Sequence, residues 1–333
     1  MAQSTAAERP HRGHPFFIIS AFTLCLTLDG RQEAPHSTYN FYVRRIFRIV
    51  PLYYVWLSIM VVWFWGISFA SIRAFKLTFL LYALFGYNFV GGNQTGLVWA
   101  SWTLGIAMLF YLAFPYIFRR VTSLPRAWIF LALTGLVSAA HYWLVTAYSE
   151  WAPGSGYTIS ISIFTYLPVF ALGMVTYFLY RDYPASQRSP LFRAGVLGVG
   201  LVAFVGFPYI THAFNMPESY YFITIYGMAA VYSVLFLGIS YYPASFLTNQ
   251  VSIFFGLISY SLYLNHPVLV DFLSPVYQMI YATGGNTTLH YFECLLVTLV
   301  ILTAISYATY RVIEQPFIAL GRRFIKRERI QAS

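Results

Sequence analysis

The sequence predicts an all-α polytopic membrane protein. Only 9% of its 333 residues are charged and 59% are hydrophobic, whereas soluble domains carry roughly a quarter charged residues. Apolar runs long enough to cross a bilayer as a helix, about 20 residues each, recur along the chain. Because helices satisfy their own backbone hydrogen bonds in lipid, these runs predict a helical bundle.

Nine or ten hydrophobic helical segments are expected, depending on whether residues 77–92 cross the membrane. No loop between the segments has room for a soluble domain, so residues 1–333 are predicted to form a single membrane domain. Residues 1–14 are its polar N-terminus and residues 318–333 are its basic tail. In chain order, the segments lie near 15–28, 49–68, 77–92, 97–118, 127–148, 158–180, 191–213, 220–242, 251–273 and 292–317.

The loop charges predict the orientation of the later segments, because cytoplasmic loops carry an excess of Lys and Arg. The basic tail is therefore expected in the cytoplasm. Counting back from it places the arginine-bearing loops 119–126 and 181–193 on the same side. The loops expected outside carry no Lys or Arg, and they are 149–157, 214–219 and 274–291.

The segment 77–92 decides the orientation of the first third of the chain. If it spans, Arg44, Arg45 and Arg48 fall outside, against the charge rule. It ends in the glycine- and asparagine-rich stretch GYNFVGGNQTG, so we favour a re-entrant or interfacial piece, which puts the arginines inside. The first span, 15–28, is short and would then run inward, so one more helix is expected upstream.

The arginines form the first candidate site. Arg44, Arg45 and Arg48 fall on one face of a helix at about 100° per residue, and Pro51 starts or kinks the span that follows. Two interpretations stay open. The cluster is either an ordinary positive flank of a membrane span or a site for phosphate, which guanidinium groups bind bidentately.

The stretch GLISYSLYLNHPVLVDF supplies the second candidate site. Ser259, Tyr263 and His266 follow at i, i+4 and i+7, so they form one polar stripe on a helix, with Gly256 a turn earlier. Histidine can act as an acid or a base near neutral pH. The alternative is a histidine that is merely satisfied at a helix end beside Pro267.

Two further stretches contain polar candidates. In ASWTLGIAMLFYLAFP, Tyr111 shares a helical face with Thr103, and Trp102 is typical of an interfacial aromatic. In YRVIEQPF, Glu314 precedes a proline expected to end the helix, and a local ion pair with Arg311 is the simple interpretation. The remaining His and Asp residues are scattered without ligand spacing, so no metal site is predicted. Topology explains the basic residues without nucleic acid.

Five motifs, in order, resemble the integral-membrane acyltransferase family 3, which O-acetylates cell-surface glycans and related acceptors. PFFIISAFTLCLTLDGR is similar to the family's second helix, written around F-F-x-I-S-G-F. FYVRRIFRIVPLYYVWL resembles R-R-x-x-R-I-x-P-x-Y, and SWTLGIAMLFYLAFP resembles W-S-x-x-x-E-x-x-F-Y-L-x-F-P. ISYSLYLNHPV is similar to S-Y-x-x-Y-L-x-H, and IEQPF to the closing E-x-P-F. The resemblance runs along most of the chain.

The resemblance implies an O-acyltransferase of the bacterial plasma membrane with no bound cofactor. Its donor substrate would be acyl-CoA, with acetyl-CoA the first expectation, taken from the cytoplasm. Its acceptor would be a hydroxyl of a carbohydrate or lipid-linked glycan. Arg44, Arg45 and Arg48 would then hold the phosphates of CoA. His266 and Tyr111 become the catalytic candidates, supported by Trp102, Ser259, Tyr263 and Glu314.

Departures from the family pattern leave a second reading open. The family's first helix, with a basic residue and a histidine, has no counterpart in this sequence, and His11 and His14 do not match it. Ala107 stands where the family has Glu, and Ala21 where it has Gly. The chain is therefore either an impaired or shortened acyltransferase or a divergent one that relies on His266 or on a partner. The rival class is non-enzymatic: a ligand-binding pseudoenzyme or a glycan or lipid carrier.

Overall fold

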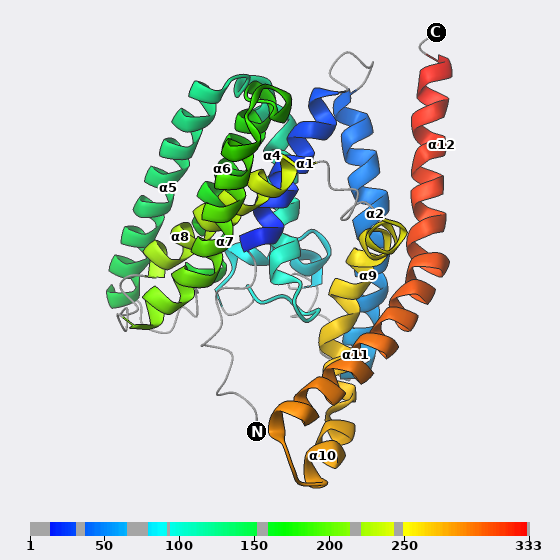
Figure 1. Cartoon of the computed structure of the whole chain (residues 1–333). Coiled ribbons are helices and arrows are strands. Elements are labelled where there is room, and N and C mark those ends of the chain that lie inside the picture. Colours follow the sequence, from blue (N-terminus) through cyan, green and yellow to red (C-terminus); the bar gives the residue numbers. More distant parts are fainter. Residues whose placement is uncertain are drawn as a thin grey trace. The chain divides into compact units, whose positions relative to one another are not determined.

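The computed structural model describes residues 14–30, 37–64, 79–91, 94–151, 159–213, 221–242 and 249–331. Within these residues, 89% are helical and no strand occurs, so the predicted all-α class is confirmed (Figure 1). The chain forms two compact units. The prediction of a single domain therefore stays a prediction, and each unit is described by itself.

Eight helices in the described part of the chain are long and apolar enough to cross a membrane. Their outward faces carry large apolar side chains, such as Trp143 at 69% exposure and Val202 at 73%, which suits contact with lipid rather than water. The protein is therefore an integral membrane protein. The spans are Ser37–Val62, Trp102–Arg120, Leu124–Tyr148, Ile163–Asp182, Pro190–Thr211, Phe222–Ser240, Gln250–Phe272 and Thr287–Ile325.

Unit 1 comprises residues 1–34, 88–94 and 106–246. Its most buried helix, α6, packs against α1, α5 and α8. A side chain at Gly173 of α6 would meet the backbone oxygen of Ile18 at 2.6 Å, so glycine permits this close approach. The rings of Phe110 and Phe170 stack with centroids 3.8 Å apart. The helices are α1 (His14–Asp29), α4 (Trp102–Arg120, from Ile106 on), α5 (Leu124–Trp151), α6 (Ile163–Asp182), α7 (Pro190–Ala213) and α8 (Tyr221–Ser240), with the short η6 (Ile159–Ile161) and η7 (Ala185–Gln187).

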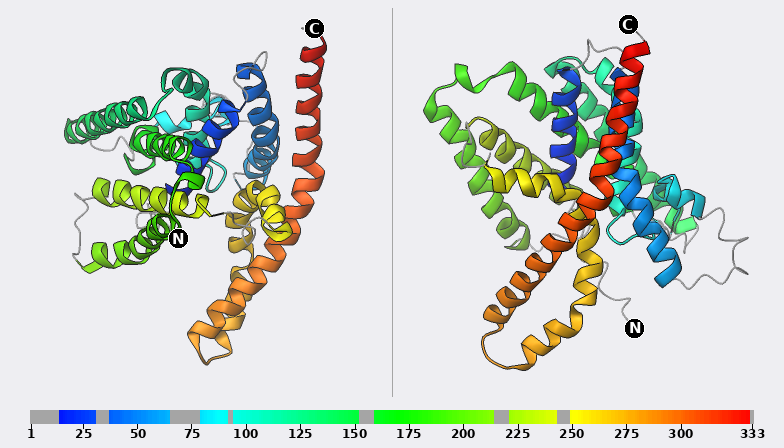
Figure 2. Two further views of the ribbon diagram at one scale, coloured as in Figure 1. Left: turned by 45° about the horizontal axis from the view of Figure 1, so that its top comes forward. Right: turned by 90° about the vertical axis from the view of Figure 1, so that its right-hand side faces the viewer.

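Unit 2 comprises residues 35–87, 95–105 and 247–333. Helix α9 packs against α2 and α11, and α12 packs against α2. Figure 2 shows α11, η9 and α12 continuing as one long helix, with α10 at the turn between α9 and α11. The elements are α2 (Ser37–Ile59), η3 (Met60–Phe64), the first half of η5 (Gly86–Phe89), α9 (Gln250–Phe272), α10 (Ser274–Ala282), α11 (Thr287–Thr309), η9 (Tyr310–Glu314) and α12 (Gln315–Gln331).

Several predicted boundaries were wrong, because hydropathy marks the apolar part of a helix and not its polar turns. Helix α2 begins at Ser37 instead of residue 49, so the three arginines lie inside the helix and Pro51 is internal to it. The last helix does not end at residue 317. It continues through Pro316 to Gln331, so most of the predicted tail is helical.

The segment predicted at 77–92 does not form one spanning helix over its described part, residues 79–91. A helical turn at 79–83 is followed by a turn and by η5. Phe85 has a positive φ of 60°, which interrupts the regular helix and is uncommon for a bulky residue. The re-entrant placement stays a prediction, as does the expected helix upstream.

Candidate functional site

The arginine cluster lies in the middle of α2. The side chains of Arg44 and Arg45 are half-buried, and that of Arg48 is exposed. The guanidinium of Arg45 lies 5.9 Å from the ring centroid of Phe41, one turn earlier. Arg48 is close enough to Glu314 for their charges to attract each other. The sequence therefore placed the cluster correctly on one helix of unit 2, and its role in phosphate binding stays a prediction.

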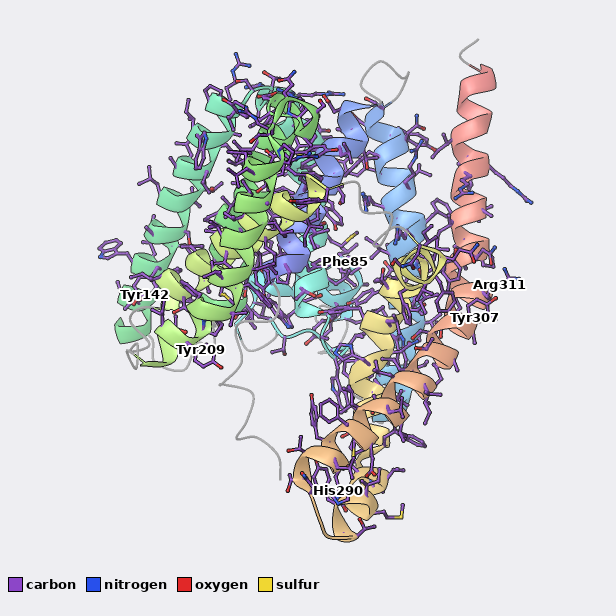
Figure 3. The ribbon with its side chains drawn as sticks, in the orientation of Figure 1. Phe85, Tyr142, Tyr209, His290, Tyr307 and Arg311 are labelled. Carbon is purple, nitrogen blue, oxygen red and sulfur yellow. The ribbon has the colours of Figure 1, made fainter. Side chains whose placement is uncertain are left out.

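Glu314 is a buried carboxylate, with 1% of its surface exposed. The hydroxyl of Ser261 on α9 donates a hydrogen bond to its Oε1 atom. Its Oε2 atom has no hydrogen-bond partner among the described residues. The ion pair expected with Arg311 does not form, because Arg311 is exposed on the long helix, where Figure 3 labels it. The side chain of Glu314 therefore contacts Ser261 of α9, and it does not pair with Arg311 of its own helix.

A polar network beside this carboxylate fixes α9 to its neighbours. Asn265, 2% exposed, accepts a hydrogen bond at Oδ1 from the indole Nε1 of Trp56 on α2 at 2.9 Å. Its Nδ2 atom donates to Ser306 and Thr309, each at 3.2 Å. One amide therefore joins three helices, and it is the residue next to His266.

Tyr263 connects α9 to the loop that precedes α4. Its hydroxyl donates to the carbonyl oxygen of Ala100 at 2.7 Å and lies 2.5 Å from the hydroxyl of Thr103. Ala100 has a φ of 62°, an uncommon conformation for a residue with a Cβ. Nearby, the hydroxyl of Tyr87 donates to the carbonyl of Ser101 at 2.6 Å. Two tyrosines therefore hold this loop through its main chain.

His266 is half-buried one turn after Tyr263. Its Nδ1 atom lies 2.6 Å from the carbonyl oxygen of Tyr263, and the two rings have centroids 5.6 Å apart. A carbonyl oxygen can only accept, so Nδ1 carries the hydrogen and Nε2 is the nitrogen that bears the lone pair in the neutral ring. The ring is therefore oriented as a base that accepts at Nε2.

The predicted stripe of Ser259, Tyr263 and His266 is only partly realised. Tyr263 and His266 lie together, but Ser259 is exposed and its hydroxyl donates to the carbonyl of Gly256 on its own helix at 2.9 Å. Ser261, two residues on, is the serine that contacts the buried side chain of Glu314. Helical spacing would have found it, because Ser261 and Asn265 are four residues apart and share a face.

The other two predicted residues lie along α4. Trp102 is the first residue of this helix, is half-buried and belongs to unit 2. Tyr111 is buried in unit 1, and its hydroxyl lies 2.6 Å from that of Ser20 on α1. Ala107 is fully buried in the same unit. The catalytic assignment of Tyr111 stays a prediction.

The fold defines an all-α polytopic membrane protein with a polar site around one helix, α9. Residues 15–309 match the sequence profile of the acyltransferase domain of acyltransferase family 3, and the chain belongs to this family. No curated protein and no solved structure gives a significant match. Membership of this family supports the assignment of the chain as a membrane acyltransferase, in agreement with the resemblance found in the five motifs.

Proposed function

We propose that this protein transfers an acyl group, acetyl first, from acyl-CoA to a hydroxyl of a cell-surface or lipid-linked glycan. The observation that carries the proposal is the orientation of His266, whose Nδ1 hydrogen is held by the carbonyl of Tyr263 at 2.6 Å. Nε2 is then the acceptor that a general base needs. Family membership supplies the reaction class.

In the proposed reaction, Nε2 of His266 takes the proton from the acceptor hydroxyl. The hydroxyl oxygen attacks the thioester carbonyl carbon, the new C–O ester bond forms and the C–S bond breaks. The proton then passes to the leaving thiolate, which departs as the CoA thiol. A base in this position typically contributes about 10²–10⁴-fold in rate.

The proposed donor site is the arginine face of α2. Arg44, Arg45 and Arg48 occupy little more than one helical turn, so their guanidinium groups can meet a compact group of phosphates, as CoA carries. Bidentate arginine–phosphate pairs are among the stronger charge-assisted hydrogen bonds. Arg48 has the most exposed side chain of the three, so we expect it to contribute most to donor binding.

A second candidate function is a pseudoenzyme that binds the donor without transferring its acyl group. Ala107 supports it, because this fully buried methyl group stands where the resembling motif has a glutamate. An alanine can neither accept a proton nor orient a base. The two candidates share the arginine site and differ in proton transfer.

The deciding experiment separates donor binding from acyl transfer. Purified protein would be given radiolabelled acetyl-CoA and a crude glycan acceptor, and Arg48→Ala and His266→Gln would be compared with wild type. We expect Arg48→Ala to raise the KM for acetyl-CoA and His266→Gln to lower kcat with little change in donor binding. Arg311→Ala is the matched control, because it removes an exposed arginine from the same unit.

The outcomes distinguish the two candidates. Donor binding without transfer by the wild type would replace the enzyme by the pseudoenzyme. Absence of donor binding would overturn both the acyltransferase and the pseudoenzyme, and it would favour a non-enzymatic glycan or lipid carrier. Equal losses of donor affinity in Arg48→Ala and Arg311→Ala would show an effect of net charge, not an arginine site.

We also propose that the C-terminus lies in the cytoplasm, where acyl-CoA is available. Arg322, Arg323, Lys326, Arg327 and Arg329 support this orientation through the charge rule. A fluorescent protein fused after Ser333 should fluoresce, whereas a phosphatase that folds only outside the cytoplasm should be inactive there. The reverse pattern would overturn the orientation.

A further inference from the structure

Helix α9 contains a proline in its interior, at position 267. In a regular α-helix each carbonyl accepts from the N–H four residues later, and proline has no N–H. The carbonyl that Pro267 leaves without its helix donor is that of Tyr263. An unpaired carbonyl in a membrane helix is costly unless another donor satisfies it.

The imidazole of His266 donates to this carbonyl. Its Nδ1 atom lies 2.6 Å from the Tyr263 oxygen, which is a short hydrogen bond for an N–H donor. Pro267 leaves the Tyr263 carbonyl without its helix N–H donor, and His266, the residue directly before this proline, donates to the same carbonyl. With any other residue at 267, a backbone N–H would compete for the same oxygen.

The acceptor itself is held in place from a second direction. The side chain of Tyr263 is anchored by its hydroxyl to the carbonyl of Ala100 and to Thr103, at 2.7 and 2.5 Å. Asn265, two residues after Tyr263, fixes the same turn of α9 through its three hydrogen bonds. The Tyr263 carbonyl is therefore a fixed point from which the imidazole is oriented.

We propose that Pro267 is a positioning residue for His266. By withholding the competing N–H, it keeps the hydrogen of the neutral imidazole on Nδ1 and leaves Nε2 as the accepting nitrogen. This inference deepens the proposed function and rests on His266 as its general base. It concerns the tautomer and orientation of the ring, and Pro267 itself touches no reacting atom.

The test is the tautomer of His266 in the variant Pro267→Ala. Nitrogen chemical shifts of histidine-labelled full-length protein in lipid nanodiscs report which ring nitrogen carries the hydrogen, and His266→Gln assigns the signal among the seven histidines. We expect one tautomer, with hydrogen on Nδ1, in the wild type and a mixture or the opposite tautomer in Pro267→Ala. The matched control is Pro208→Ala, an exposed helix-interior proline of α7 that follows a phenylalanine.

Kinetics complete the test. In Pro267→Ala we expect kcat to fall about tenfold or more, within the range that a general base contributes, and the pH profile of kcat to shift, while the KM for acetyl-CoA stays within about twofold. A folded Pro267→Ala with the wild-type tautomer would overturn the inference. An altered tautomer with unchanged kcat would support the positioning and overturn the proposed role of His266. If Pro267→Ala does not fold, Pro267→Ser restores the same N–H and answers the same question.

Discussion

Replacing Asn265 by alanine should lower the free energy of unfolding by about 2–3 kcal/mol. The side chain is 2% exposed and makes three interhelical hydrogen bonds, to Trp56, Ser306 and Thr309. Such bonds within membranes average about 0.6 kcal/mol each, so three contribute about 2 kcal/mol. The indole N–H of Trp56 is left without its acceptor, which adds to the loss.

A double-mutant cycle isolates the bond between α2 and α9. Trp56→Phe and Asn265→Ala would be made singly and together, and reversible unfolding in mixed micelles would give the four free energies. We expect a coupling of about 0.6–1.7 kcal/mol between the two changes, which runs from the average to the largest value found for interhelical side-chain bonds. Ser259→Ala is the control. Among the described residues, the exposed hydroxyl of Ser259 bonds only to its own helix, so its loss should change stability by less than about 0.5 kcal/mol.

Additive effects of the two substitutions would refute this reasoning. They would show that the 2.9 Å contact between Trp56 and Asn265 contributes no stabilising energy between α2 and α9. A loss in Ser259→Ala equal to that in Asn265→Ala would refute it in another way, because exposure and partner identity would then not matter.

The remaining predictions concern packing and the buried carboxylate. Gly173→Ala should destabilise the protein by about 1–3 kcal/mol, because the added methyl would lie 2.6 Å from the Ile18 oxygen. Gly135→Ala should instead raise the melting temperature, because it removes a helix-interior glycine at a position where no atom lies within 4 Å of the added methyl. Equal shifts of the melting temperature in the two variants would contradict both predictions. Ser261→Ala should cost about 1–3 kcal/mol, because Glu314 loses its donor. Adding Glu314→Met should recover most of that loss, and no recovery in thermal unfolding would show that the hydrogen bond is not the cause.

Most of the fold could be predicted from the sequence, because a membrane span needs a long apolar run and composition displays it directly. The eight long helices all correspond to predicted segments. Helix ends were harder, since a helix can continue through polar residues and through proline. Helix α2 shows this at its start, where a dozen residues, including the arginines, precede the apolar run.

The site could be predicted only in part, for a different physical reason. Spacing in one helix gives the face that a residue occupies but not the segment that covers this face. Tyr263 and His266 were found by spacing, whereas their acceptors are main-chain carbonyls, of Ala100 and of Tyr263 itself. Every residue has a backbone carbonyl, so no pattern of residue types in the sequence indicates which carbonyl accepts a given hydrogen bond. Proline is the exception, because Pro267 inside a helix predicts that the carbonyl of residue 263 lacks its usual helix N–H donor.

In the motif IEQPF, the helix continues through its proline and the carboxyl group of Glu314 is buried. Pro316 has no N–H for the carbonyl of Val312, and the preceding residues form the π-helix η9, in which the N–H of Gln315 bonds to the carbonyl of Tyr310, five residues back. One extra residue in a turn rotates the later side chains by about 100° relative to the earlier ones. Glu314, at the end of this turn, is buried against Ser261, while Arg311 and Val312 are exposed. In an uninterrupted α-helix the side chain of Glu314 would point in a different direction. The π-turn is therefore the local feature that directs this side chain toward Ser261. Such turns occur frequently at functional positions.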